Sequence, residues 1–287
     1  MTAAAGFGAP GAGTSAAAPA IELESLVHVY PEGTRALVGV DLRVAAGEAV
    51  AIIGQNGSGK STLVRHLNGL LRPTEGVVRV DGRDTEGIRV ARLAAVVGLA
   101  FQDPDRQIFA GRVRTEVAFG PRNLGVRGPA LDRAVADALA AVGLADAADA
   151  NPYDLGYSRR KLLAIASVLA MRTPIVILDE PTTGQDLRGA ARVQAIVRGL
   201  LAEGRTVLAV SHDMRFVAET FRRVVVMREG RIVLDGTPEQ VFAETAWPVL
   251  ASTHLEAPLP ARVGARLGLG STPTEAALVE ALVTARG

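Results

Sequence analysis

Gly54-Gln55-Asn56-Gly57-Ser58-Gly59-Lys60-Ser61-Thr62 is the stretch of this 287-residue chain that decides the fold. It follows residues 49–53, a wholly apolar run typical of a strand buried on both faces of a parallel sheet. It leads into residues 60–70, whose pattern predicts a helix. A short apolar strand, a glycine-rich turn and a helix in this order predict an α/β fold.

The stretch also matches in full the pattern of a loop that binds nucleotide phosphates. Glycine permits close approaches that a Cβ would block, so successive N–H groups can face phosphate oxygens, and the following helix adds the positive end of its dipole. We expect Lys60 to reach the β- and γ-phosphates of ATP and Ser61 to bind Mg²⁺. A chance Gly/Ser turn is disfavoured by the flanking strand and helix. The predicted nucleotide-binding residues of this phosphate loop are Gly54, Asn56, Gly57, Ser58, Gly59, Lys60, Ser61 and Thr62.

Two acids, Asp179 and Glu180, follow a second apolar run at residues 175–178. The end of such a strand opens onto the crevice where α/β folds bind ligands, and adjacent side chains point to opposite sides. Asp179 is then placed to hold Mg²⁺ through its water shell, and Glu180 to act as general base on the attacking water. Acids that only cap a strand are the alternative, and the phosphate loop favours catalysis.

Two further residues end predicted strands. His212 follows the apolar run at residues 206–210, and this position favours a γ-phosphate contact over a purely structural histidine. Tyr30 ends a predicted strand at residues 21–30, where it is placed either to stack on adenine or to serve as an ordinary half-buried aromatic.

The remaining pattern alternates short strands with helices and includes one hairpin. Helices are predicted at residues 129–142, 158–171, 193–203 and 274–285, further strands at 77–80 and 96–101, and the hairpin at 224–227 and 232–234.

Composition excludes several classes of protein. Lys plus Arg is 31 and Asp plus Glu is 30, a balance that argues against a nucleic-acid partner. There is no cysteine, so disulfides and thiolate metal sites are excluded. No run reaches the roughly 18 to 20 apolar residues of a membrane span, so any membrane role acts through a partner. Residues 1–20 lack Lys and Arg, and we interpret them as a flexible tail.

The motifs together resemble the nucleotide-binding subunits of ABC transporters, over about residues 21–242. The resemblance implies a P-loop NTPase core with a mostly parallel sheet, an antiparallel β-subdomain and a helical subdomain inserted at about residues 102–171. It implies that Gln102 touches Mg²⁺ or the attacking water, and that Asp186 lies in a loop crossing a dimer interface. The motifs follow one another in the order Tyr30, the phosphate loop, Gln102, a signature near Leu155, Asp179-Glu180, Asp186 and His212.

Residues 101–109 and 115–121 are similar to the ATPases of energy-coupling factor importers, which take up vitamins and transition-metal ions. This resemblance implies a second ATPase subunit, identical or different, and a transmembrane coupling protein that docks near Gln102. It also implies a separate membrane protein that captures the substrate, and a place for this chain on the cytoplasmic face of the membrane. Residues 243–287 would form a C-terminal extension that contributes to pairing.

The signature turn, residues 155–159, departs from the family. It reads Leu-Gly-Tyr-Ser-Arg where Leu-Ser-Gly-Gly-Gln is usual, and in the family this turn caps the γ-phosphate bound to the opposite subunit. Either Ser158 supplies a hydroxyl from a shifted loop, with charge from Arg159 or Arg160, or the turn is a weak half-site completed by a different ATPase. A solvated helix face is the alternative for residues 159–161. Gln185 replaces a more usual leucine.

Three other functions compete. A soluble ABC-type ATPase acting on nucleic acid or ribosomes usually carries a long insert or a second cassette, and neither is present. A non-catalytic nucleotide-binding module would fit the altered signature turn but not the intact acids. A small-molecule P-loop kinase leaves Gln102, Asp186 and His212 without a role.

Overall fold

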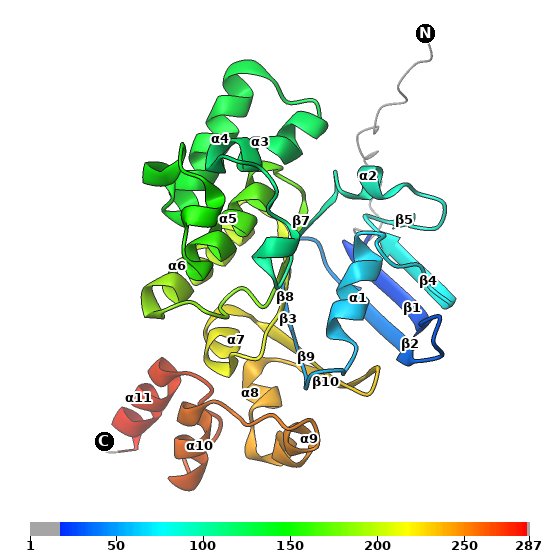
Figure 1. Cartoon of the computed structure of the whole chain (residues 1–287). Helices are drawn as coiled ribbons and strands as arrows, with labels where there is room; N and C mark the ends of the chain where they lie inside the picture. The colour runs from blue at the N-terminus through cyan, green and yellow to red at the C-terminus, as the bar shows by residue number, and fades with distance from the viewer. Residues whose placement is uncertain (1–17, 286–287) are drawn as a thin grey trace.

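The computed structural model describes residues 18–285, which form two sheets, a helical lobe and a C-terminal helical module (Figure 1). Most of the tail predicted at residues 1–20 lies outside the described residues. None of the helices within residues 18–285 is long and apolar enough to cross a membrane.

The larger sheet has six strands, and its apolar centre explains the runs seen in the sequence. Its order is β10-β9-β3-β8-β7-β6, and all neighbours are parallel except the β9–β10 hairpin. Every residue of β3, β7 and β8 is buried because helices or sheet cover both faces. The predicted α/β fold is therefore confirmed. The strands are β3 (Ala49–Ile53), β6 (Val97–Ala100), β7 (Ile175–Asp179), β8 (Thr206–Val210), β9 (Arg223–Arg228) and β10 (Arg231–Gly236).

The smaller sheet is antiparallel, in the order β2-β1-β4-β5. Helix α1 (Lys60–Leu67) lies between the two sheets (Figure 1), and its Leu63 and Leu67 share one apolar cluster with both. The helix ends three residues before its predicted end at residue 70, because Gly69 takes a left-handed φ of 75°. The strands are β1 (Ile21–Val29), β2 (Arg35–Val44), β4 (Glu75–Val80) and β5 (Arg83–Asp84).

Helices, among them those of the helical lobe, cover the other face of the larger sheet, where Leu163 and Val193 belong to one apolar cluster with residues of strand β3. The lobe contains α3 (Val113–Asn123), α4 (Gly128–Val142) and α5 (Tyr157–Ala170), and the short helix α2 (Val90–Leu93) lies near α3. Helix α6 (Leu187–Ala202) follows the lobe in sequence and contacts strand β8, α4 and the short helix α7 (Met214–Thr220). The prediction that a helix starts at residue 193 is wrong. Helix α6 starts at Leu187 because the Asp186 carboxylate caps it, accepting from the Gly189 N–H at 2.7 Å.

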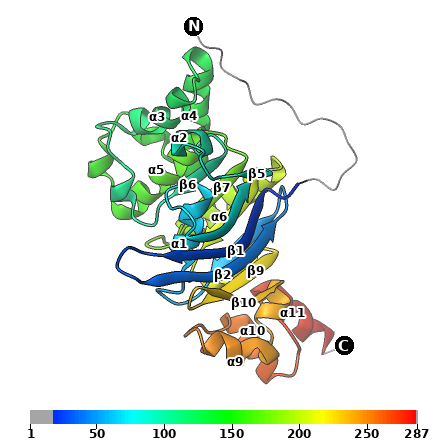
Figure 2. The same ribbon diagram turned by 90° about the vertical axis from the view of Figure 1, so that its right-hand side faces the viewer.

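The C-terminal module lies beside the β9–β10 hairpin (Figure 2). It contains α8 (Pro238–Val241), α9 (Trp247–Ala251), α10 (Leu259–Arg266) and α11 (Glu275–Thr284). Phe242 and Leu250 anchor it in the core shared with the helical lobe. Helix α11, in contrast, has no buried residue although seven of its ten residues are apolar. Its sequence is Glu-Ala-Ala-Leu-Val-Glu-Ala-Leu-Val-Thr.

Candidate nucleotide site

The functional residues gather where the parallel strands end. The phosphate loop follows β3, Asp179 and Glu180 end β7, and His212 follows β8, three neighbouring strands of one sheet. A cavity of about 290 Å³ opens at this edge. Ten predicted site residues line it, namely Tyr30, Asn56, Gly57, Gly59, Lys60, Ser61, Thr62, Gln102, Asp179 and Glu180.

The phosphate loop is shaped by close backbone approaches. Gly59 has a φ of 101°, and a Cβ at this position would lie 2.6 Å from the Ala36 carbonyl oxygen. The Lys60 ammonium group donates to the carbonyl oxygens of Gly54 at 2.7 Å and Gln55 at 2.9 Å. Burial lowers the pKa of Lys60, while the charges of Glu180 and Asp179 act in the opposite direction. The loop therefore holds a buried cation facing two acids.

Asp179 is buried, and burial, followed by the charge of Glu180, raises the pKa of its carboxyl group. Its Oδ1 atom has no hydrogen-bond partner among the described residues. Ser61 and Gln102 place further oxygens on the same cavity. Oxygen ligands suit Mg²⁺, which usually takes only one or two from protein carboxylates and the rest from phosphates and water. Within residues 18–285 no group of three or more His or acidic side chains forms a separate metal site.

Glu180 is held in a strained conformation. Its φ is 51°, a region that non-glycine residues rarely adopt, and its N–H donates to the Val210 carbonyl at 2.8 Å. The ring Nδ1 of His212 lies 2.7 Å from its carboxylate and donates to it. Because the imidazole side chain is 63% exposed, it contacts Glu180 at the rim rather than lining the cavity. His212 thus orients the acid, and its predicted γ-phosphate contact stays a prediction.

Lys161 is a buried cation next to the site residue Gln102, and the sequence did not reveal its burial. The interpretation of residues 159–161 as a solvated face is wrong here, since Lys161 is only 1% exposed. Its ammonium group donates to the Gln102 carbonyl at 2.6 Å, and burial lowers its pKa to about 8. Arg159, in contrast, lies on the surface and pairs with Asp146. A run of three basic residues gave no sign that one of them is buried.

Tyr30 touches the cavity through a small polar cluster. Its hydroxyl lies 3.0 Å from that of Thr62, and its ring meets the His28 ring edge-on at a centroid distance of 4.6 Å. His28 in turn contacts His66, 3.2 Å from ring nitrogen to ring nitrogen. Neither histidine was singled out from the sequence, because no motif contains them.

Ser158 and Asp186 do not line the cavity. The Ser158 hydroxyl donates to the Gln185 side-chain oxygen at 2.7 Å, and Asp186 caps helix α6. Gly54, Ser58 and His212 also lie outside the lining, although Gly54 and Ser58 surround the Lys60 ammonium group.

Comparison with known proteins agrees with this geometry. The family model described as ABC transporter matches residues 37–183, from strand β2 through the phosphate loop to the segment after Glu180. The chain belongs to the ABC transporter family. This ABC protein is an ATPase, since the family and its cassette relatives hydrolyse ATP.

The similar proteins include ATP-binding proteins of energy-coupling factor transporters. The chain is 41% identical to the energy-coupling factor transporter ATP-binding protein EcfA of Methanothermobacter thermautotrophicus, over 82% of this chain and 76% of that protein. It is 42% identical to a putative ABC transporter ATP-binding protein of Geobacter sulfurreducens, over 83% of this chain and 94% of that protein. Among solved structures, cbiO1 of Clostridium perfringens, described as part of the ABC transporter complex cbiONQ, gives a TM-score of 0.73. It is 34% identical, covering 88% of this chain and 99% of that one.

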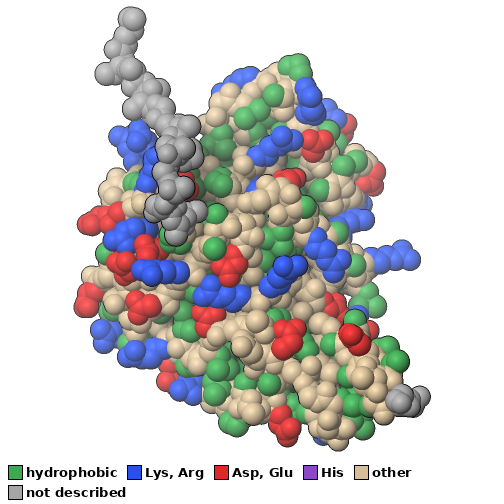
Figure 3. Space-filling model, turned by 180° about the vertical axis from the view of Figure 1, so that it is seen from behind, with side chains coloured by type: hydrophobic (Ala, Val, Ile, Leu, Met, Phe, Trp, Pro, Cys, Tyr) green, Lys and Arg blue, Asp and Glu red, His purple; other side chains and the backbone are tan. Residues whose placement is uncertain are grey.

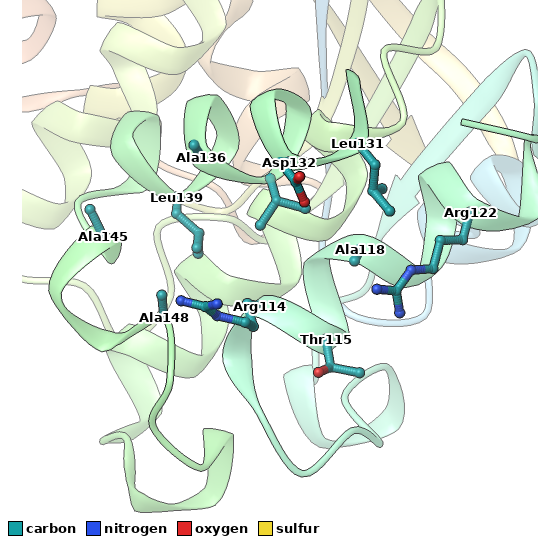
Figure 4. Close-up of a pocket in the computed structure, with 11 residues that line it drawn as sticks. Arg114, Thr115, Ala118, Arg122, Leu131, Asp132, Ala136, Leu139, Ala145 and Ala148 are labelled. Atoms are coloured by element: carbon teal, nitrogen blue, oxygen red, sulfur yellow. The ribbon is translucent and has the colours of Figure 1, made fainter. Parts of the chain in front are cut away.

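A second cavity of about 350 Å³ lies in the helical lobe between α3 and α4 (Figure 4). Its wall is built from small and apolar side chains such as Ala118, Leu131 and Leu139. Arg114 at its rim already pairs with Asp149 at 2.9 Å. This cavity lacks the acids and the phosphate loop, so the smaller cavity at the sheet edge is the candidate nucleotide site.

Proposed function

We propose that this ABC ATPase energises an energy-coupling factor type importer for a vitamin or a transition-metal ion. The sequence relatives named EcfA and the structural relative cbiO1 support this assignment. The observation that carries it is an apolar groove beside Gln102, lined in part by residues of the stretches 101–109 and 115–121 that resemble this importer class.

The groove suits a partner helix from a transmembrane coupling protein. It measures about 280 Å³ and is walled by Leu70, Phe101, Phe109, Phe119 and Met171. The Phe109 and Phe119 rings pack edge to face, 4.7 Å between centroids, and remain 59% and 48% exposed. An exposed aromatic pair at the mouth of an apolar groove is typical of a docking surface.

The groove is also held rigid. The buried Glu116 carboxylate accepts from the backbone N–H groups of Phe109 at 3.0 Å and Ala110 at 2.8 Å. It therefore fixes the loop that carries Phe109, as a preformed docking site requires. Docking there would place the ATPase peripherally on the cytoplasmic face of the membrane, with substrate captured by a separate membrane protein.

In the proposed reaction, Lys60 and the phosphate loop hold the triphosphate while Tyr30 stacks on adenine. Glu180, oriented by His212, polarises water for in-line attack on the γ-phosphate. Ser61, Gln102 and Asp179 would hold Mg²⁺, which supplies positive charge to the phosphate oxygens when bound. The chain's own contribution is to fix the position of the acid and of the ammonium group before the nucleotide arrives.

A second ATPase subunit, identical or different, would complete the assembly. Helix α11 supports this, because its Val279 and Val283 are exposed and none of its side chains is buried. Hydrophobic side chains are visible on the C-terminal module at the lower right of Figure 3, whereas the broad face above it interleaves acidic and basic side chains. Such an apolar surface on a terminal helix is typical of an interface between subunits.

The double variant Phe109→Asp/Phe119→Asp tests the docking proposal. We expect the purified variant to keep the ATP turnover of the isolated wild-type chain, because neither ring touches the nucleotide cavity. In membranes it should no longer co-purify with a transmembrane protein, and uptake should fail. The matched control is Val279→Asp/Val283→Asp, which changes the apolar surface of α11 instead. Retention of the membrane partner by the Phe109/Phe119 variant would reject this docking site.

A further inference from the structure

The signature turn is joined to the loop that follows Glu180 by a reciprocal pair of hydrogen bonds. The Ser158 hydroxyl donates to Gln185 Oε1 at 2.7 Å, and Gln185 Nε2 donates back to the Ser158 carbonyl at 3.0 Å. Both residues depart from the usual family pattern. The contact links the first turn of α5, in the helical lobe, to residues 181–186 beside the larger sheet.

The packing around this contact leaves no room for larger residues. Gly184 has a φ of 75°, and a Cβ there would lie 2.7 Å from the Tyr157 ring. A Cβ at Gly189 would lie 2.2 Å from Gln185 Oε1. Both distances are too short for a real contact, so the two glycines, Tyr157 and Gln185 fit as a set.

The loop between Glu180 and Gln185 is short and hydrogen-bonded within itself. The Thr183 N–H donates to the Glu180 carbonyl at 3.3 Å, and the Gln185 N–H to the Thr182 carbonyl at 3.0 Å. Asp186 then caps α6. Because these hydrogen bonds restrain the loop, we expect a displacement of Gln185 to displace Glu180 as well.

The Ser158 hydroxyl has one hydrogen to donate, and it donates that hydrogen to the Gln185 side chain. Its remaining lone pairs would repel phosphate oxygens rather than bind them. Gly156 contributes no side chain, and its surroundings are open, with nothing within 4 Å of a Cβ placed there. The signature turn therefore offers a phosphate only backbone groups and nearby arginines.

We propose that Ser158 and Gln185 are positioning residues which clasp the helical lobe to the loop leaving Glu180, and that the Ser158 hydroxyl is not a phosphate ligand. The effect on turnover rests on the proposed role of Glu180. The clasp couples the orientation of the helical lobe to the position of the catalytic acid.

A double-mutant cycle with Ser158→Ala and Gln185→Ala in the purified full chain tests the clasp, with Ser158→Thr as the conservative variant. Ser158→Ala, which removes one hydrogen bond, should lower kcat for ATP about fivefold with KM unchanged, and Gln185→Ala, which removes both, should lower kcat at least as much. The double variant should lose no more than the more damaged single variant. Ser158→Thr should retain turnover, and Gln194→Ala, which removes a side-chain hydrogen bond to Glu219 away from the signature turn and the nucleotide cavity, is the control.

Urea unfolding of the same variants gives a measure that does not depend on activity. Each single change should lower the midpoint, and the double variant should lower it no further, whatever the role of Glu180. Three results would each overturn the clasp. They are a loss of turnover in Ser158→Ala but not in Gln185→Ala, losses of turnover that multiply in the double variant, and single variants that match the wild type. A coupled loss of stability without a coupled loss of kcat would reject the effect on Glu180.

Discussion

The phosphate loop and the signature turn are both short polar turns that lead into a helix, yet they use their residues in opposite ways. In the phosphate loop, glycines bring the backbone close to its neighbours and Lys60 faces the cavity. In the signature turn, Gly156 is open to solvent and the Ser158 hydroxyl is hydrogen-bonded to Gln185 of the same chain. The first turn is shaped to receive a ligand, whereas the second is shaped to join two parts of the fold.

The largest effect should come from adding a Cβ atom at Gly59, where the phosphate loop lies against the backbone of Ala36. Gly59→Ala would place a Cβ 2.6 Å from the Ala36 carbonyl oxygen at a φ of 101°. We expect a loss of about 3 kcal/mol in the free energy of unfolding, together with loss of ATP binding. Urea unfolding and titration with a fluorescent ATP analogue measure the two effects. Wild-type affinity in a stable Gly59→Ala protein would contradict the geometry of the loop.

Lys161→Met should have the next largest effect. It removes the buried ammonium group that donates to the Gln102 carbonyl. Loss of a hydrogen bond from a charged donor is expected to lower the rate of ATP turnover about tenfold. We expect ATP turnover to fall about tenfold, while Arg172→Met, at the exposed position that follows the same helix, leaves turnover unchanged. Equal turnover in both variants would mean that α5 does not position Gln102.

His66 gives a pH-dependent contribution to stability. Its Nδ1 faces the Thr62 carbonyl and its Nε2 faces His28 Nδ1, which also contacts the Arg72 carbonyl. Each Nδ1 atom faces a carbonyl oxygen, which can only accept, so each Nδ1 must carry the hydrogen of its ring. A proton on His66 Nε2 would therefore place an N–H group against the N–H group of His28 Nδ1. Burial lowers the pKa of His66, and His28 adds to this effect.

Because the folded state then binds fewer protons than the unfolded chain, stability should be fully present above about pH 6.5 and fall as the pH drops below that value. His66→Asn should flatten this part of the stability profile, whereas His254→Asn, at an exposed position, should not. Urea unfolding between about pH 5 and 8 measures the difference. An unchanged slope in His66→Asn would show that another group titrates.

Gly156→Ala should have the smallest effect. Its φ is −61° and nothing lies within 4 Å of the added Cβ, so the change in stability should stay within about 0.5 kcal/mol. This variant is the matched control for Gly59→Ala, one glycine in each turn. A large loss would mean that the signature turn is packed as tightly as the phosphate loop.

The sequence predicted those parts of the site that lie within one strand, one turn and one helix. Residues 49–62 contain all the information for the phosphate loop, since the apolar strand, the glycines and the helix are consecutive. The acids were predicted for the same reason, because strand β7 ends at Asp179. The fold class followed from the fully buried strands β3, β7 and β8.

Contacts between distant segments were not predicted. Lys161 lies in a run of three basic residues, and only its packing against the Gln102 loop, 59 positions away, shows that it is buried. Gln185 and Ser158 are 27 positions apart. Helix α3 was missed because it contains Gly120 and Pro121, residues that usually end helices.

Single-turnover hydrolysis by Glu180→Gln tests the central claim most directly. The variant should bind a fluorescent ATP analogue as tightly as the wild type, because Lys60 and the phosphate loop are unchanged. Release of inorganic phosphate should fall at least about a hundredfold through loss of the general base, while the surface control Glu203→Gln keeps the wild-type rate. Phosphate release at the wild-type rate by a well-folded Glu180→Gln protein would contradict the account.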